Sequence, residues 1–221
     1  MIRFEHLTKV FRLEGKSKTV ADDICATFPS GVAVGLLGRN GAGKSTLLQM
    51  IAGTMDPTSG RILTSGSISW PVGFAGSFHP DLTGIQNVRF VARIYAVDTD
   101  ELIDFVGEFA ELGVHYGLPF RTYSSGMRSR LAFGISMGIH FDTYLVDEIT
   151  AVGDAAFKRK SMRFFHDRLQ RSGAVMVTHA MEQVRQMCSA VAVLENGRMT
   201  YFDDVAAGIA YHERNMQLGR G

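Results

Sequence analysis

A glycine-rich segment with one lysine and one serine offers the clearest chemistry in this sequence. Gly38-Arg-Asn-Gly-Ala-Gly-Lys-Ser45 fits the pattern G-x-x-x-x-G-K-[ST], in which backbone N–H groups curve around phosphate oxygens. Lys44 would supply a positive charge for the β- and γ-phosphates, and Ser45 a hydroxyl for Mg²⁺. A chance glycine-rich turn is the alternative, but an apolar run precedes the segment and a helix-like run follows it. The expected nucleotide contacts are Gly38, Arg39, Asn40, Gly41, Ala42, Gly43, Lys44, Ser45 and Thr46.

Two adjacent carboxylates end a second apolar run, Tyr144-Leu-Val-Asp147-Glu148. Side chains alternate along an extended strand, so the two acids point in different directions and can divide the work. Asp147 is expected to hold Mg²⁺, and Glu148 to orient or deprotonate the attacking water. The alternative is an ordinary acidic loop after a buried strand, but the phosphate loop favours the catalytic interpretation.

Two further polar positions follow or precede apolar runs. His179 follows the strand-like run Ala174–Thr178, and the carboxyl ends of parallel strands converge on the ligand crevice in this type of fold. An imidazole there could reach the γ-phosphate, although a lone histidine is more often structural.

Tyr123-Ser-Ser-Gly-Met127 precedes a helix-like run. It is either a second anion site at a helix N-terminus or a simple helix cap.

Strand-like and helix-like runs alternate along the chain, which predicts an α/β fold with a largely parallel sheet. Ile2–His6 and Ile24–Phe28 are expected to be short strands, and Val32–Leu37 a buried one. Lys44–Ala52 is expected to form the helix after the phosphate loop. The stretch Ser65–Gly76 is rich in glycine and serine and is expected to be a loop.

The middle third of the chain changes character, because helix-like runs dominate it. This predicts a helical lobe over about residues 76–140, inserted into a core of about residues 1–75 and 141–221. One helix is expected to begin at Asp81, and a capping box of Asp98 with Glu101 is expected to open the next.

Composition limits the classes of function. The chain is 46% hydrophobic and 20% charged with a net charge of +1, which fits a globular domain and leaves no basic field for nucleic acid. Met1–His6 contains no signal segment, and the longest weakly polar run, Leu131–Phe141, falls short of the roughly 20 residues of a membrane span. A membrane role is therefore expected only through a partner. Cys25 and Cys188 predict reduced thiols in the core of a cytosolic protein.

Together the motifs resemble those of ABC transporter nucleotide-binding subunits over essentially the whole chain. Residues 38–45 correspond to the Walker A motif and residues 145–148 to the Walker B motif with its catalytic glutamate. By the same resemblance, Ser124, Ser125 and Gly126 form the signature motif that contacts ATP in the partner subunit. Asp154 ends the D-loop, His179 is the switch histidine, and Phe11 sits where an aromatic residue usually stacks on adenine.

Two motifs depart from the usual family pattern. In the signature, Ser125 and Met127 replace the usual Gly and Gln. No glutamine lies between residues 60 and 82, so the Q-loop position falls either on His79, a further candidate metal contact, or on Phe74.

These departures also indicate one branch of the family. Ser69-Trp-Pro71, Leu82-Thr-Gly84 and the altered signature resemble exporters of capsular polysaccharide, and related subunits export O-antigen or teichoic acid. Many of those carry an extra C-terminal domain. Here Gly221 follows soon after the last helix-like run, which favours the capsule type.

The resemblance implies a RecA-like P-loop core with an inserted helical subdomain, acting as an ATP hydrolase with ATP and Mg²⁺. It implies a head-to-tail homodimer, integral membrane permease partners, and a peripheral position on the cytoplasmic face of the inner membrane, with only indirect membrane contact and no nucleic acid. Three rivals remain open: a soluble P-loop kinase, a non-hydrolysing regulatory subunit, and the ATPase of an importer.

Two surface features each allow two interpretations. The helix expected over Ala155–Arg171 either contacts anionic lipid headgroups or is an ordinary solvated face. Val88, Val91 and Tyr95 form a stripe at helical spacing that is either lobe core or a groove for a partner. The basic residues of the helix are Lys158, Arg159, Lys160, Arg163, Arg168 and Arg171.

Overall fold

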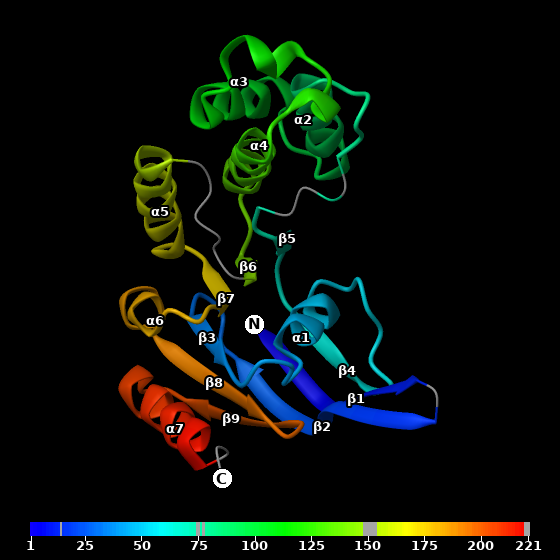
Figure 1. Cartoon of the computed structure of the whole chain (residues 1–221), viewed down its shortest axis with the longest axis vertical. Coiled ribbons are helices and arrows are strands. Elements are labelled where there is room, and N and C mark those ends of the chain that lie inside the picture. The colour runs from blue at the N-terminus through cyan, green and yellow to red at the C-terminus, as the bar shows by residue number, and fades with distance from the viewer. Residues whose placement is uncertain (14, 74–75, 77, 148–153, 219–221) are drawn as a thin grey trace. The chain divides into compact units, whose positions relative to one another are not determined.

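The computed structural model describes residues 1–13, 15–73, 76, 78–147 and 154–218, which divide into two compact units. The first unit takes its described residues from Met1–Ser69, Phe141–Glu148 and Leu169–Gly221, and the second from Trp70–His140 and Ile149–Arg168. Each unit therefore joins stretches that are distant in the sequence, as the colours of Figure 1 show. The expected lobe limits of about 76–140 stay a prediction; the second unit begins at Trp70 and adds a later stretch of chain.

Two sheets make up the strand framework. An antiparallel sheet has the order β2-β1-β4, with β1 (Ile2–Leu13), β2 (Lys16–Phe28) and β4 (Ser59–Thr64). The other sheet has the order β5-β6-β7-β3-β8-β9. Its strands are β3 (Ala33–Leu37), β5 (Ile68–Pro71), β6 (Thr143–Asp147), β7 (Gly173–Val177), β8 (Ala190–Glu195) and β9 (Arg198–Phe202). Strands β6, β7, β3 and β8 are parallel and β9 returns antiparallel, which confirms the expected α/β class.

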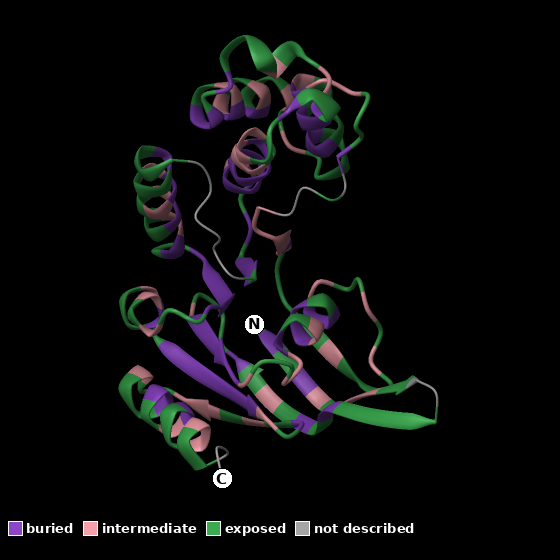
Figure 2. Ribbon diagram, in the orientation of Figure 1, coloured by how far each residue is buried: buried purple, intermediate pink, exposed green. Residues whose placement is uncertain are grey.

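The central strands are buried along their whole length. Every residue of β3 and of β7 is buried, and so are the first five residues of the neighbouring β8; purple dominates β7 and β8 in Figure 2. Core residues of the antiparallel sheet such as Phe4 and Ile24 belong to the same apolar cluster as Leu36 and Val175. Because burial holds these strands in place, it also fixes the positions of the residues that follow their carboxyl ends. The helices of this unit are α1 (Lys44–Ile51), α6 (Met181–Met187) and α7 (Val205–Leu218).

The second unit is helical. It contains α2 (Gly84–Ile94), α3 (Thr99–Ala110), α4 (Ser125–Gly138), most of α5 (Ala155–Leu169), and the short 3₁₀ turns η1 (Gly113–Gly117) and η2 (Phe120–Thr122). The Phe109 ring lies between 5.3 and 6.0 Å from four other phenylalanine rings, two of which belong to α5. This aromatic packing explains why α5 groups with the helical lobe. Within the described residues, no helix is both long and apolar enough to span a membrane.

The helix stripe and the helix starts partly follow the expectations. Val88 and Val91 are buried, as lobe core requires, whereas Tyr95 is exposed and its ring lies 4.9 Å from that of Trp70. Asp98 caps α3 by accepting from two backbone N–H groups. A full reciprocal capping box forms at Thr83 with Gln86, so the preceding helix, α2, begins after Thr83 and not at Asp81.

Three expectations were wrong. Strand β5 lies inside the stretch expected to be a loop, and it is held by the Leu145 N–H, which donates to the buried Ser69 hydroxyl at 2.9 Å. Strands β1 and β2 extend well beyond the short runs expected, because pairing in a hairpin stabilises polar, exposed residues that show no apolar alternation. Cys25 is exposed and only Cys188 is buried, since Cys25 neighbours the inward-facing Ile24 along β2.

Candidate functional site

A cavity of about 420 Å³ in the first unit gathers most of the residues expected to handle phosphate and Mg²⁺. Its walls come from β1 and β2, from the loop before α1 and the first turn of α1, from the ends of β6 and β7, and from the loop after β7. It is lined by Phe11, Lys18, Val20, Asn40, Gly41, Gly43, Lys44, Ser45, Thr46, Asp147, Val177 and His179. Side chains that are up to 168 positions apart in the sequence thus share one hollow.

The loop before α1 adopts a conformation that requires glycine. Gly41 has φ 77° and Gly43 has φ 106°, in the left-handed region that other residues seldom occupy. A Cβ at Gly43 would stand 2.7 Å from the Val20 Cβ, so the loop lies directly against β2. Gly43 also caps α1, whose first turn carries no acidic residue within this described helix. The positive end of the helix dipole is therefore not neutralised by acids of its own first turn.

Lys44 lies in the wall of the cavity. The residue is only 8% exposed, and its Nζ donates to the carbonyl of Gly38 at 2.7 Å and to that of Arg39 at 2.9 Å. The ammonium thus closes the loop on itself and brings a positive charge to the place where a phosphate would sit.

Asp147 and His179 reach the cavity from neighbouring parallel strands. Asp147 is the last residue of β6 and pairs with Val177 at the end of β7. Between β7 and His179, the buried Thr178 hydroxyl donates to Gln183 Oε1 at 3.0 Å and accepts from the Ala180 N–H at 3.1 Å. These bonds fix the loop that carries His179. Glu148, the expected catalytic base, lies outside the described residues, as do residues 151–153 of the D-loop and Phe74.

The cavity offers oxygen ligands of the kind that Mg²⁺ prefers. The Ser45 hydroxyl and the Asp147 carboxylate both line it, and hard oxygen donors together with phosphate oxygens are the usual environment of this ion. The residues present therefore fit the expected metal.

The side chain of Arg39 points away from this cavity, and Lys18, which carried no expectation from the sequence, lines it. Nε of Arg39 lies 3.0 Å from Glu195 Oε1, and its Nη2 donates to the Asn215 carbonyl, so the side chain is directed toward β8 and α7. Lys18 lines the cavity instead and pairs across the hairpin with Phe11. Sequence reasoning missed Lys18, because no motif marks it; its only signal is this position opposite an exposed aromatic residue.

The signature segment lies at the start of α4 in the second unit. Ser124 is the N-cap, and its Oγ accepts from the Met127 N–H at 3.2 Å. Ser125 and Gly126 form the first turn, which contains no acidic residue within the described helix. The structure thus confirms a helix cap, and it leaves exposed a helix N-terminus of the type that binds anions.

Asp154 is bonded within the second unit. Its Oδ1 accepts from the N–H groups of Ala156 and Phe157, and its Oδ2 from Arg130 at 2.6 Å. The Phe157 N–H, helped by Arg130, holds the pKa of this carboxyl below its usual value. Asp154 therefore caps α5 and connects it to α4.

His79 is positioned by an asparagine that sequence reasoning overlooked. Asn87 is 1% exposed; its amide donates to the carbonyls of His79, Leu82 and Thr83, and its Oδ1 accepts from the His79 N–H at 2.9 Å. The exposed His79 ring accepts from the Asp81 N–H through Nδ1. The sequence did not mark Asn87 as important, because it stands directly before Val88, where the apolar stripe begins.

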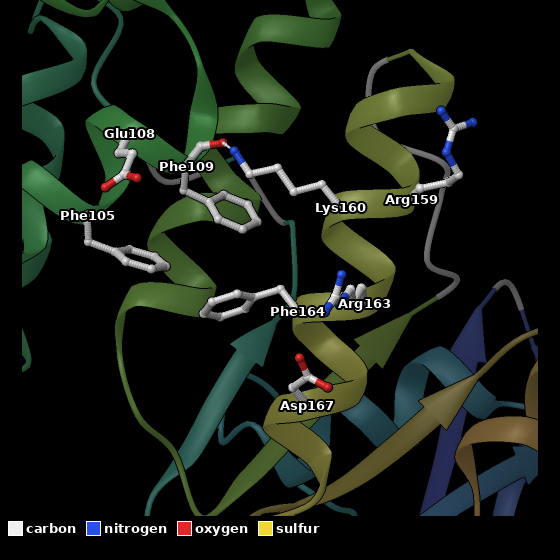
Figure 3. A pocket seen from close by; sticks show the side chains of 8 residues that line it. All are labelled: Phe105, Glu108, Phe109, Arg159, Lys160, Arg163, Phe164 and Asp167. Carbon is white, nitrogen blue, oxygen red and sulfur yellow. Dashed lines mark hydrogen bonds between the residues drawn. The ribbon is translucent and has the colours of Figure 1, made fainter.

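A second cavity, of about 530 Å³, lies within the helical unit between α3 and α5. Figure 3 shows the rings of Phe105, Phe109 and Phe164 facing one another there, with charged side chains around them. Lys160 donates to the Phe109 carbonyl and to Glu111, and Arg168 to the Met137 carbonyl. Part of the basic surface of α5 is therefore used in packing its own unit.

Comparison with known proteins gives one consistent family. Residues 21–151 match the family model described as ABC transporter. The chain is 50% identical, over 99% of both sequences, to the polysialic acid transport ATP-binding protein KpsT of Escherichia coli. It is 44% identical, over 96% of this chain and 98% of the relative, to the capsule polysaccharide export ATP-binding protein CtrD of Neisseria meningitidis serogroup B.

The fold is also similar to a solved structure. The ATP-binding cassette MJ0796, in a dimeric post-hydrolysis state bound to ADP and Pi, matches 91% of this chain and 97% of its own, with a TM-score of 0.77 at 19% identity. This confirms the expected cassette fold, with a P-loop α/β core and a helical subdomain.

Proposed function

This chain belongs to the ABC transporter family, and on that basis we propose that it is the ATP-binding and ATP-hydrolysing subunit that powers export of a capsular polysaccharide through a separate permease. The cavity that joins the phosphate loop to Asp147 and His179 carries the ATPase part of the proposal. The cargo part rests on near full-length similarity to proteins named for transport of polysialic acid and capsule polysaccharide.

ATP binds with its phosphates on the loop of residues 38–46. The glycine backbone and the N-terminus of α1 supply N–H donors, and Lys44 turns from the carbonyls of Gly38 and Arg39 to the phosphate oxygens. Phe11, 39% exposed at the edge of the cavity, offers a face for the adenine ring. Lys18 adds a second positive charge beside Gly41.

Hydrolysis requires a water aimed at the γ-phosphate and stabilisation of developing charge. Ser45 and Asp147 would hold Mg²⁺, which supplies charge neutralisation at the phosphate oxygens when bound. Glu148 follows Asp147 and is assigned to orient and deprotonate the water, while His179 contacts the γ-phosphate from the end of β7. The exposed ring of His79 is assigned a further contact with the metal, from its place at the Q-loop position.

A second copy of the chain completes the site. The loop of residues 38–46 covers one side of a strongly anionic triphosphate, and the acid-free N-terminus of α4, with Ser124, Ser125 and Gly126, suits the other side. ATP thus joins two subunits head to tail, with Asp154 beside the junction, and hydrolysis releases them. The opening and closing is passed to integral membrane permease subunits, which place the protein at the cytoplasmic face of the inner membrane.

Deleting the gene tests the cargo. Cells that make a capsule should lose the surface polymer and accumulate it inside, and the wild-type gene should restore export whereas Lys44→Ala should not. A capsule that is unchanged while another surface glycan disappears would move the cargo to that glycan and leave the ATPase proposal standing.

A further inference from the structure

An exposed histidine, aspartate and cysteine meet on strands β1 and β2, and none of them lines the nucleotide cavity. One ligand atom from each of His6, Asp23 and Cys25 lies within 4.8 Å of the others. We propose that these three side chains form a binding site for a thiophilic divalent metal ion, with Zn²⁺ as the representative, that clips β1 to β2.

Strand register places the three side chains on one face. Leu7 pairs with Ile24 across the two strands, and both side chains are buried in the core. Because side chains alternate along a strand, the neighbours His6, Asp23 and Cys25 point to the opposite, solvent-facing side. All three are exposed, so an ion can reach them.

Irregular backbone on both strands brings the side chains closer than a regular ladder would. The register of β1 with β2 shifts between Phe4 and Leu7, and His6 (φ 51°) and Asp23 (φ 52°) both adopt the left-handed conformation. This conformation is uncommon for residues other than glycine. As a result, the His6 N–H donates to Cys25 Sγ at 3.4 Å, and His6 Nδ1 lies 2.8 Å from Asp23 Oδ1.

The donor set selects the class of metal. Imidazole nitrogen, thiolate sulfur and carboxylate oxygen together suit Zn²⁺ and Co²⁺, whereas Mg²⁺ prefers oxygen alone. With metal–ligand distances of about 2.0–2.3 Å, ligand atoms around a tetrahedral ion are about 3.3–3.8 Å apart. Small rotations of these exposed side chains, which move each ligand atom by about one ångström or less, would reach that spacing.

A water molecule can supply the fourth ligand, and metal binding releases the thiol proton of Cys25. A hollow of about 330 Å³ beside the trio leaves room for a water as the fourth ligand. Cys25 binds as the thiolate, so its proton passes to the buffer and affinity rises with pH. The residues around the hollow are Asp22, Asp23, Ile24, Cys25, Arg198 and Met199.

Cobalt absorption tests the site in the full-length, nucleotide-free protein. With a non-chelating phosphine reductant and excess Mg²⁺ present, one equivalent of Co²⁺ should give a thiolate-to-cobalt charge-transfer band that one equivalent of Zn²⁺ removes. Cys25→Ser should abolish the band, and His6→Ala and Asp23→Ala should each weaken Zn²⁺ binding about tenfold or more. His166→Ala is the matched control, because His166 is an exposed histidine 3.9 Å from Asp167 with no thiol in the pair.

A second measurement tests whether the bound ion stabilises the fold. Zn²⁺ should raise the unfolding temperature of the wild-type protein and of His166→Ala, and should raise those of Cys25→Ser and His6→Ala less at the same Zn²⁺ concentration. ATP binding by these variants checks that they fold, since none of the substituted side chains lines the cavity. A band that survives Cys25→Ser, displacement of Co²⁺ by Mg²⁺, or equal Zn²⁺ affinity in all variants would each overturn the proposal.

Discussion

Replacing Lys44 by methionine removes one positive charge from the nucleotide cavity while keeping a side chain of similar length. In the structure, the ammonium is buried and bonded to two loop carbonyls. At about 3 Å and an effective dielectric constant of about 20, it would attract one phosphate charge by about 5 kcal/mol. Giving up the two bonds costs about 1–1.5 kcal/mol each, which leaves about 2–3 kcal/mol for ATP. Lys44→Met should therefore raise the Kd for ATP by about 30- to 150-fold.

Calorimetric titration of ATP without Mg²⁺ measures this difference directly. Lys158→Met is the matched control, because Lys158 is exposed on α5 and outside the cavity, and its affinity for ATP should equal that of the wild type. Circular dichroism checks that the variant still folds without the two bonds. An increase in Kd of less than about threefold, in a folded variant, would refute the assignment of Lys44 as a phosphate ligand.

Three further variants or measurements probe other parts of the account. Glu148→Gln should keep ATP affinity and lose turnover, because it removes the base and leaves the phosphate contacts; steady-state hydrolysis at the wild-type rate would exclude Glu148 as the base. Asn87→Ala should lower the free energy of unfolding by about 2–4 kcal/mol, since four hydrogen bonds of a buried side chain are lost, and a denaturant midpoint equal to that of the wild type would contradict this. Burial raises the pKa of Cys188 to about 12, so at pH 8 a thiol reagent should label only the exposed Cys25 in the native protein and both cysteines after unfolding.

Most residues of the expected phosphate site share one cavity, and they could be picked out from the sequence because each part of that site is local. The glycines, Lys44 and Ser45 lie within eight consecutive residues, Asp147 ends the apolar strand β6, and His179 stands two residues after the apolar strand β7. Parallel strands then bring these ends to one edge of the sheet, as the shared cavity shows. The role of Glu148, which the paired carboxylates suggested, and the contact of the signature motif with ATP in a partner subunit, which came from resemblance, stay predictions.

The features that sequence reasoning missed depend on pairing between distant segments. Lys18 joins the site only because β2 pairs with β1 opposite Phe11. Strand β5 forms in a glycine- and serine-rich stretch because the Ser69 hydroxyl accepts from a residue of β6. Asn87 is one of several polar residues of α2, and its four bonds form only when the preceding loop folds back on it. Contacts of this kind produce no periodic pattern in the order of the residues, so the sequence alone does not reveal them.

The most direct measurement is a structure of the Glu148→Gln protein with ATP and Mg²⁺. We predict two copies, with each triphosphate lying on residues 38–46 of one protomer and under residues 124–126 of its partner. Nucleotide bound away from residues 38–46, or signature segments that face solvent in a fully loaded dimer, would contradict it.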